Sequence, residues 1–372
     1  MVPVEFSRAV EAAVGARGVI TEPEQLRTYE CDGLTGYRVT PSLVVLPTSA
    51  AEVSATVRLC HEHGIPFVAR GAGTGLSGGA LPVADGIVIS LARMNRILEV
   101  DLASERITVE PGVTNLDVTK AVAAEGYYYA PDPSSQQVCT IGGNVAENSG
   151  GAHCLKYGFT VNHVTGLELV LPDGELLQLG GKTLDLEGPD LIGAFVGSEG
   201  TLGIATKITL RLLRRPEAVR TILAAFESTD AAGGAVSDVI AAGILPAAIE
   251  MMDAVTIEAA EAAVNANYPE GCGAVLIVEL DGPVAQVEED LERVQAICRE
   301  NEAREIRVAS DPEDRYAVWR GRKAAFAAMG RISPDYYVQD GVVPRTKLPE
   351  VLRRTAELST EYGLRVASVF HA

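Results

Sequence analysis

The sequence predicts an α+β protein built from two parts. With 372 residues, the chain exceeds the usual size of a single hydrophobic core, so more than one domain is expected. Up to residue 215, glycine-rich loops join short strands and helices. From residue 216, strands alternate with amphipathic helices, which is typical of a mostly antiparallel sheet with helices on one face. Arg214-Arg-Pro216 separates these patterns, so we expect domains at 1–215 and 216–372.

The composition excludes several functional classes. A formal net charge of −19 argues against nucleic acid as a partner, because nucleic acid needs a clustered basic surface. Hydrophobic residues make up 47% of the chain, as in a globular protein, yet no apolar run reaches the roughly 18–20 residues of a membrane span. The six cysteines form no C-x-x-C pair, and the N-terminus shows no signal-peptide pattern, so a cytoplasmic protein with reduced thiols is expected.

The first elements should form a β-α-β unit. A helix up to Gly15 precedes a short buried strand at Pro41–Pro47. Ser49-Ala-Ala-Glu52 is a capping box that opens a helix, and Gly64 ends that helix. The next strand, Ile65–Val68, follows at once. This order predicts that the two strands pair in parallel.

The loop after that strand is the most informative stretch. Arg70-Gly-Ala-Gly-Thr-Gly-Leu-Ser-Gly-Gly79 allows positive φ angles, and several N–H groups can point into one concavity that suits phosphate. Gly73–Gly78 matches G-x-G-x-x-G, but that fingerprint requires a helix to begin inside it. The residues that follow break a helix, and Gly86–Leu91 is another expected strand. The loop therefore joins two strands, which excludes a nicotinamide-binding fold; a flexible surface turn is the alternative.

The rest of the first part combines strands with an unusual density of loops. Long ordered loops in compact domains are usually functional, although some serve only as connections. Expected strands lie at Ile97–Asp101, Arg106–Pro111, Val164–Leu171, Glu175–Leu179 and Ile204–Leu212, with the third and fourth forming a hairpin, and a helix opens at Thr114. The loop motifs are Pro131–Ser135, Thr140–Asn144, Asn148–Gly151, Lys156–Gly158 and Gly197–Gly203.

The second part should contain five strands and several helices. A helix is expected at about Asp230–Ala242, and a helix-rich piece then runs to Ala266. The expected strands are Thr221–Phe226, Ala274–Leu280, Ile306–Ala309, Tyr336–Pro344 and Leu364–His371, and the clearest helices are Val284–Asn301 and Pro349–Tyr362.

Together and in this order, the glycine loop and the loop motifs Pro131–Ser135, Ile141–Asn144, Lys156–Gly158 and Gly197–Gly203 resemble the FAD-linked oxidases of the vanillyl-alcohol-oxidase type. The similarity extends from about Pro41 to the end and is strongest to the glycolate oxidase FAD subunit and D-lactate dehydrogenase group. It implies a two-subdomain PCMH-type FAD-binding domain at 1–215. An α+β substrate (cap) domain with a mostly antiparallel sheet would follow at 216–372, incomplete at its C-terminus.

The resemblance also implies where FAD binds. The pyrophosphate would lie on the backbone amides of Gly71 to Ser77. Relatives with covalent flavin carry a histidine where this chain has Thr74, so FAD should be bound non-covalently. The implied cofactor-binding residues are Arg70, Gly71, Ala72, Gly73, Thr74, Gly75, Leu76, Ser77, Pro131, Ser134, Thr140, Gly143, Asn144, Ser149, Gly150, Tyr157, Gly158, Glu199, Gly203 and Ile204.

The implied reaction oxidises a small D-2-hydroxy acid, such as glycolate or D-lactate, to the 2-oxo acid by hydride transfer to flavin N5. Arg322 matches the carboxylate-binding arginine of the family, since a guanidinium can hold a carboxylate through two parallel hydrogen bonds. Arg320 is the alternative carboxylate-binding residue. For each of the two arginines, the alternative to a role in binding is an ordinary ion pair at the surface. Electrons would pass to partner subunits, a quinone or oxygen, and such partners would hold a cytoplasmic protein at the membrane periphery.

His371 is the second implied catalytic residue. Relatives have H-x-G-D-G-N-x-H here, whose histidines bind a divalent metal such as zinc, whereas this chain reads Val-Phe-His371-Ala372. A zinc site needs three or four ligands, so the metal would require a longer chain. A lone histidine can also be an ordinary packed or exposed residue. Two other functions therefore stay open: a catalytically incomplete FAD-binding fragment, and a flavoenzyme of the same fold that acts on an alcohol or an ether lipid precursor.

Overall fold

The computed structural model describes residues 2–183, 188–334 and 336–371, and the chain forms two compact units. The first unit comprises residues 1–151 and 158–215, and the second comprises residues 152–157 and 216–372. The chain passes between units at 215/216, within Arg214-Arg-Pro216, but the six residues 152–157 also belong to the second unit. In the described ranges, no helix is both long and apolar enough to cross a membrane.

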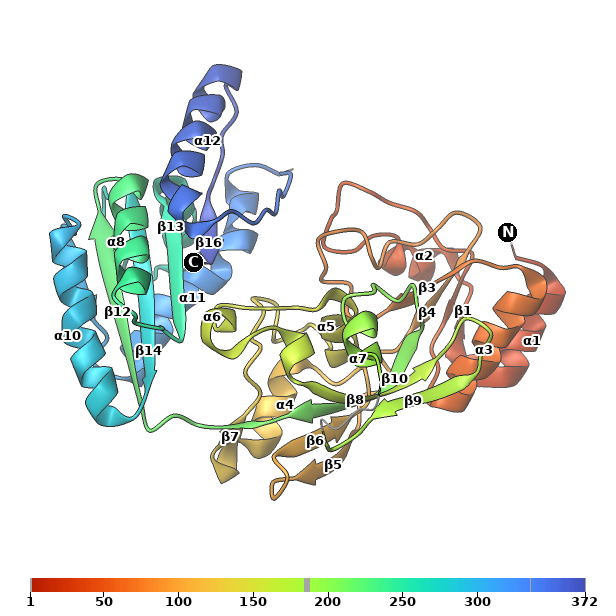
Figure 1. Cartoon of the computed structure of the whole chain (residues 1–372). Helices are drawn as coiled ribbons and strands as arrows, with labels where there is room; N and C mark the ends of the chain where they lie inside the picture. Colours follow the sequence, from red (N-terminus) through yellow and green to blue (C-terminus); the bar gives the residue numbers. More distant parts are fainter. Residues whose placement is uncertain (1, 184–187, 335, 372) are drawn as a thin grey trace. The chain divides into compact units, whose positions relative to one another are not determined.

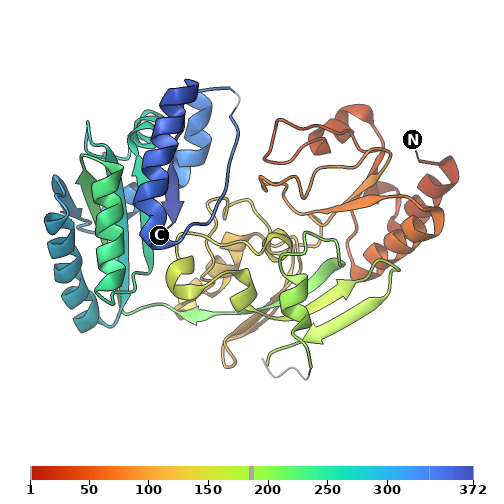
Figure 2. The ribbon, with the colours of Figure 1, turned by 45° about the horizontal axis from the view of Figure 1, so that its top comes forward.

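The first unit begins with a four-stranded sheet of order β1-β2-β4-β3 (Figure 1). Its strands are β1 (Val19–Ile20), β2 (Leu43–Val45), β3 (Phe67–Arg70) and β4 (Ile87–Ser90). The prediction that β2 and β3 pair directly is wrong, because β4 lies between them and is parallel to both. The helices α1 (Val4–Val14) and α3 (Ala50–His63) lie side by side against this sheet (Figures 1 and 2), and Ser49 caps α3 as predicted.

A second, antiparallel sheet of order β5-β6-β10-β8-β9 completes the first unit. The β8–β9 pair confirms the expected hairpin. The strands are β5 (Ile97–Asp101), β6 (Arg106–Val109), β8 (Val164–Val170), β9 (Leu176–Gly180) and β10 (Ile204–Arg211), and the associated helices are α4 (Asn115–Val122), α5 (Ile141–Glu147) and α7 (Leu191–Phe195).

Two expected loops are helical instead. Ile141–Asn144 begins α5, because the hydroxyl of Thr140 accepts the N–H of Gly143 and so caps a helix that two glycines would otherwise disfavour. Lys156 and Tyr157 end the short helix α6 (Cys154–Tyr157). For α5, local capping thus outweighs the glycine-rich composition on which the loop prediction rested.

The second unit is built on an antiparallel sheet of order β15-β12-β14-β13-β16. The α+β class is confirmed, but helices cover both faces rather than one. α8, α10 and α12 pack on one face, and α9 and α11 on the other (Figure 1). The elements are β12 (Ala218–Phe226), α8 (Thr229–Ala241), β13 (Ala248–Asp253), α9 (Ala254–Val264), β14 (Ala274–Gly282), α10 (Val284–Glu300), β15 (Glu305–Val308), α11 (Pro312–Ala328), α12 (Leu348–Tyr362) and β16 (Val369–His371).

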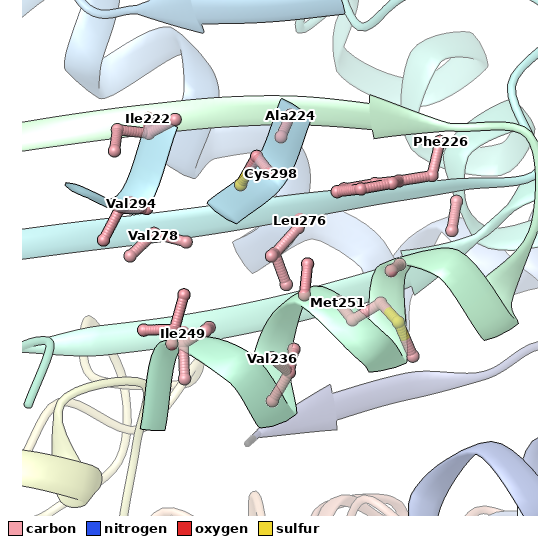
Figure 3. Close-up of a cluster of buried hydrophobic side chains, with 14 of the residues drawn as sticks. Ile222, Ala224, Phe226, Val236, Ile249, Met251, Leu276, Val278, Val294 and Cys298 are labelled. Carbon is pink, nitrogen blue, oxygen red and sulfur yellow. The ribbon is translucent and has the colours of Figure 1, made fainter. Parts of the chain in front are cut away.

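Alternation along the strands produces two different layers. On the α8 and α10 side the layer is wholly hydrophobic (Figure 3), with Leu276 and Val278 of β14 facing Val236 of α8 and Val294 of α10. The strand residues that alternate with these, such as Val275 and Ile277 of β14, point to the other face, toward α11. That layer is apolar in its middle but also holds the buried carboxylate Glu279. The layer that faces α11, with its buried carboxylate, contributes to the candidate site described below.

Three predictions for the second unit are wrong. Residues 336–344 form no strand, and they are exposed or half-buried, so a strand there would have little to pack against. The last strand covers only Val369–His371. The expected helix-rich piece contains β13, whose Ala-Ile-Glu-Met-Met composition favours a helix, but burial between two neighbouring strands overrides that propensity.

Candidate functional site

The glycine loop confirms the predicted strand–loop–strand connection. It leaves β3 at Arg70 and reaches β4 without any helix from residue 71 to 86, all of which the structure describes. Gly73 and Gly78 have φ angles of +69° and +83°, which only glycine adopts easily. No atom lies within 4 Å of the position that a Cβ of Gly78 would take, so the loop exposes bare backbone to open space.

A cavity within the first unit adjoins the start of this loop. Its walls come from the end of β3, the first turns of α5, Leu169 of β8 and the segment from Ser198 to Ala205. Backbone segments approach closely here: a Cβ on Gly142 would lie 2.6 Å from the Cβ of Pro111. Five of the residues around the cavity are glycines, so backbone rather than side chains forms part of its wall. Six predicted cofactor-binding residues line it, namely Arg70, Gly71, Thr140, Gly143, Gly203 and Ile204.

The other predicted cofactor-binding residues lie outside the lining of this cavity. The buried side chain of Asn115 links two of them, because its Nδ2 donates to the carbonyl of Pro131 (3.0 Å) and to Oδ1 of Asn144 (2.9 Å). Tyr157 belongs to the second unit, where its hydroxyl donates to Asp281 (2.6 Å). The full set outside the lining is Ala72, Gly73, Thr74, Gly75, Leu76, Ser77, Pro131, Ser134, Asn144, Ser149, Gly150, Tyr157, Gly158 and Glu199.

Arg70 braces the glycine loop. Its guanidinium is buried and donates from Nη1 to the carbonyls of Cys31 (2.8 Å) and Ala80 (3.2 Å), while it lies 5.6 Å from the centre of the Tyr29 ring. Burial lowers the pKa of Arg70, and the negative charge of Asp32 opposes that effect. These two hydrogen bonds connect the start of the loop to its end at Ala80 and to the separate segment at Cys31.

Two carboxylates face the other end of the loop: Glu199, a predicted cofactor-binding residue, and Glu147, which the sequence analysis missed. Glu147 Oε1 lies 3.5 Å from the Cβ position of Gly75, and Glu199 Oε2 lies 3.2 Å from that of Gly79. Burial raises the pKa of Glu147, and the charges of Glu199 and Asp32 raise it further. Among the described residues, Oδ2 of the buried Asp32 has no hydrogen-bond partner. Their spacing in the sequence gave no sign that these three acids would meet.

In the second unit, the structure brings the two predicted catalytic residues together on one carboxylate, that of Glu250. Arg322 donates from Nε and Nη2 to Oε2, both at 2.7 Å, and His371 Nδ1 lies 2.6 Å from Oε1. Arg320, the alternative to Arg322, donates instead to the carbonyl of Asn265 (2.9 Å) at the surface. Sequence reasoning missed Glu250 because it lies in the unpredicted strand β13.

The expected metal does not fit the residues that the structure describes. His371 and Glu250 supply two potential ligands, and no cluster of three or more histidine, cysteine, aspartate or glutamate side chains suited to a metal occurs in the described ranges. A structural or catalytic zinc site takes at least three protein ligands. We therefore derive no chemical step through a metal.

A second buried carboxylate, Glu279, lies on the same face of the sheet. It accepts hydrogen bonds from His153, Thr221, Arg315 and Trp319 at 2.6–2.9 Å. Burial opposes its ionisation, but hydrogen bonds from His153 and Arg315 outweigh burial and hold the pKa of Glu279 well below its usual range. This carboxylate thus ties α11 and the segment 152–157 to the sheet.

Comparison with protein families identifies both parts of the chain. Residues 41–180 match the FAD binding domain family, and residues 215–372 match the C-terminal domain of FAD linked oxidases. Together with the glycine-lined cavity, these matches define an FAD-dependent oxidoreductase.

Individual relatives agree with this class. The chain is 51% identical to the glycolate oxidase subunit GlcD of Escherichia coli K12, over 95% of this chain and 71% of that protein. It is 34% identical to a D-lactate dehydrogenase of Anaerostipes hadrus, over 89% and 71% of the two chains. The structure of 4-ethylphenol oxidase from Gulosibacter chungangensis superimposes with a TM-score of 0.82 at 21% identity, covering 100% and 81%. The chain belongs to the FAD-linked oxidase family.

The raised pKa of Glu147 predicts a pH-dependent gain in stability for Glu147→Gln. Because the ionised form is disfavoured in the folded protein, wild-type stability should fall as pH rises from the unfolded pKa through the folded pKa. At pH 7–8 the FAD-free variant should therefore melt about 1–3 °C higher than wild type, a small effect since Glu147 is exposed and solvent screens its charge. At pH 4 the difference should vanish. Thermal melts would test this, with the exposed Glu24→Gln as control; a pH-independent difference would contradict it.

Proposed function

We propose that this chain binds FAD non-covalently and oxidises a small 2-hydroxy acid, of the glycolate or D-lactate kind, to the 2-oxo acid. The observation that carries the proposal is the 51% identity to a glycolate oxidase subunit over nearly the whole chain. The similarity to a D-lactate dehydrogenase supports the same substrate class. The D configuration of the substrate is part of the proposal.

The cavity and the glycine loop would hold FAD jointly. The amides of Gly71 to Thr74 suit the pyrophosphate, because Gly71 lines the cavity, the following residues continue the loop from it, and backbone N–H groups favour an anion. The end of the loop near Gly75 and Gly79 faces the carboxylates of Glu147 and Glu199, which would repel phosphate and instead accept hydrogen bonds from hydroxyl groups of the cofactor. The cofactor-binding residues predicted from the sequence are proposed as a set on this basis.

Bound FAD supplies a ring that accepts a hydride from the carbon bearing the substrate hydroxyl. Arg322 would bind the substrate carboxylate and thereby orient that carbon. Its Nε–Nη2 edge is held by Glu250, and the Nη1–Nη2 edge of a guanidinium has the same fork geometry for a second carboxylate. His371, on the other oxygen of Glu250, would contact the substrate hydroxyl.

The electron acceptor would lie outside this chain. The Escherichia coli relative is named as a subunit, which supports transfer from the flavin to partner subunits or a quinone. Association with a membrane would then be peripheral, through those partners.

The function is tested by mixing FAD-loaded protein with candidate substrates without oxygen and recording the flavin absorption. Glycolate and D-lactate should bleach the flavin bands. Ethylene glycol, which lacks a carboxylate, should not. If no 2-hydroxy acid reduces the flavin, the proposed reaction is wrong.

Gly75→Glu should abolish FAD binding. The new carboxylate would lie against the loop and beside Glu147, whose Oε1 is 3.5 Å from the Cβ position, so repulsion of the pyrophosphate would be strong. The purified variant should be colourless and take up no added FAD. Gly341→Glu is a matched control, because that glycine is exposed and lies in open space in the second unit. A yellow Gly75→Glu protein would argue against the loop as the phosphate site.

Arg322→Lys should raise KM for glycolate or D-lactate on the order of 10- to 100-fold. Lysine keeps the charge, but its ammonium group lacks the two edges with paired N–H donors by which a guanidinium can hold Glu250 and a substrate carboxylate at the same time. Arg320→Lys, two residues away on the same helix, should leave KM unchanged because Arg320 contacts only a surface carbonyl. Steady-state kinetics would decide, and equal effects of the two substitutions would show that Arg322 is not the carboxylate clamp.

A further inference from the structure

We propose that Glu250 is a positioning residue of the substrate site, which fixes the guanidinium of Arg322 and the imidazole of His371 relative to each other. This inference rests on the proposed function. It assigns a role to a residue that the sequence pattern did not single out.

Glu250 is almost completely buried in the layer of the sheet that faces α11. An ionised carboxylate in such a place is tolerated only when its oxygens are paired. Here the two oxygens have different partners: Oε2 accepts both N–H groups from Arg322, and Oε1 meets Nδ1 of His371. One rigid group thus sets the separation of two side chains from distant parts of the sequence.

The contact with Arg322 fixes the plane of its guanidinium. The Arg322 side chain is only 11% exposed, and both Nε and Nη2 point to the same oxygen. A guanidinium held along one edge has little freedom to rotate, so the direction of its Nη1–Nη2 edge is set as well. Glu250 therefore determines where a substrate carboxylate would be bound.

The contact with His371 selects one form of its ring. Glu250 and His371 are directly opposite each other on β13 and β16. Because an ionised carboxylate can only accept, Nδ1 must carry the proton, and a neutral ring then presents Nε2 as an acceptor. The His371 side chain is 60% exposed, so Nε2 is accessible. A 2-hydroxy acid carries a carboxylate and a hydroxyl on adjacent carbons. The guanidinium of Arg322 would bind the carboxylate and Nε2 of His371 would accept from the hydroxyl, and Glu250 positions both groups.

Glu279 provides an internal comparison. In the strand register Glu279 pairs with Ala248 and Glu250 with Ile277, so the two residues are diagonal neighbours on one face, with α-carbons about 7–8 Å apart. Both hold an arginine of α11. However, Arg315 bridges the two oxygens of Glu279, and Trp319 and Thr221 donate to the same carboxylate from α11 and β12. Glu279 thus anchors α11 without contact to Arg322 or His371.

This difference makes Glu250→Gln and Glu279→Gln a matched pair. Each replaces a buried carboxylate by an amide of the same size, and each should lower the melting temperature. Only Glu250→Gln removes the common anchor of Arg322 and His371, so it should raise KM for glycolate or D-lactate on the order of 10- to 100-fold. Its flavin content and kcat should change much less. Glu250→Asp, which keeps the charge but is one methylene shorter, should raise KM to an intermediate value.

The experiment measures KM, kcat, flavin absorption and melting temperature for FAD-loaded wild type and the three variants. Glu279→Gln should keep KM within about twofold of wild type. An unchanged KM in Glu250→Gln or Glu250→Asp, or a loss of kcat alone, would overturn the positioning role. An equal rise of KM in Glu279→Gln would show that Glu250 only anchors α11, and it would also overturn the positioning role. A wild-type flavin that no 2-hydroxy acid reduces would reject the proposed function instead.

Discussion

The second unit depends on the need to pair two carboxylates inside a β-sheet. Glu250 and Glu279 occupy neighbouring strands where solvent cannot reach them, and each ion costs several kcal/mol to bury unless it is matched. α11 meets this need with Arg315 and Arg322, which are seven residues apart and hence two turns along one side of the helix. The buried carboxylates of this unit are therefore neutralised by arginines from a single helix.

In the first unit the important residues are glycines, which have no side chain, rather than paired charges. Where Gly142 meets Pro111, a single added carbon would collide with the neighbouring segment, while beside Gly78 the backbone faces open space. Close packing shapes the cavity on one side, and exposed amides are left on the other. Arg70 keeps this arrangement rigid by holding the carbonyl of Ala80, just after the loop, and the carbonyl of Cys31 in an earlier segment.

The sequence was most predictive where local chemistry determines structure. The capping serine Ser49, the strand–loop–strand character of Gly71–Gly79 and the α+β class follow from short-range rules, and the structure confirms them. Contacts between distant residues were not predictable. Glu250 lies in a segment whose composition favours a helix, and its pairing with Arg322 spans 72 positions in the chain. Likewise, Glu147 gave no sign of approaching the glycine loop, since only tertiary packing brings them together.

The six residues 152–157 have a consequence for how this protein can be divided. They pack with the second unit, where Lys156 and Tyr157 bond to Asp281 and His153 bonds to Glu279, yet they are encoded within the first. A gene cut at 215/216 would therefore yield a C-terminal piece without part of its own core. Recombination between homologues would have to exchange this hexapeptide together with the C-terminal half. The two units are compact, but the second unit is not one continuous stretch of the chain.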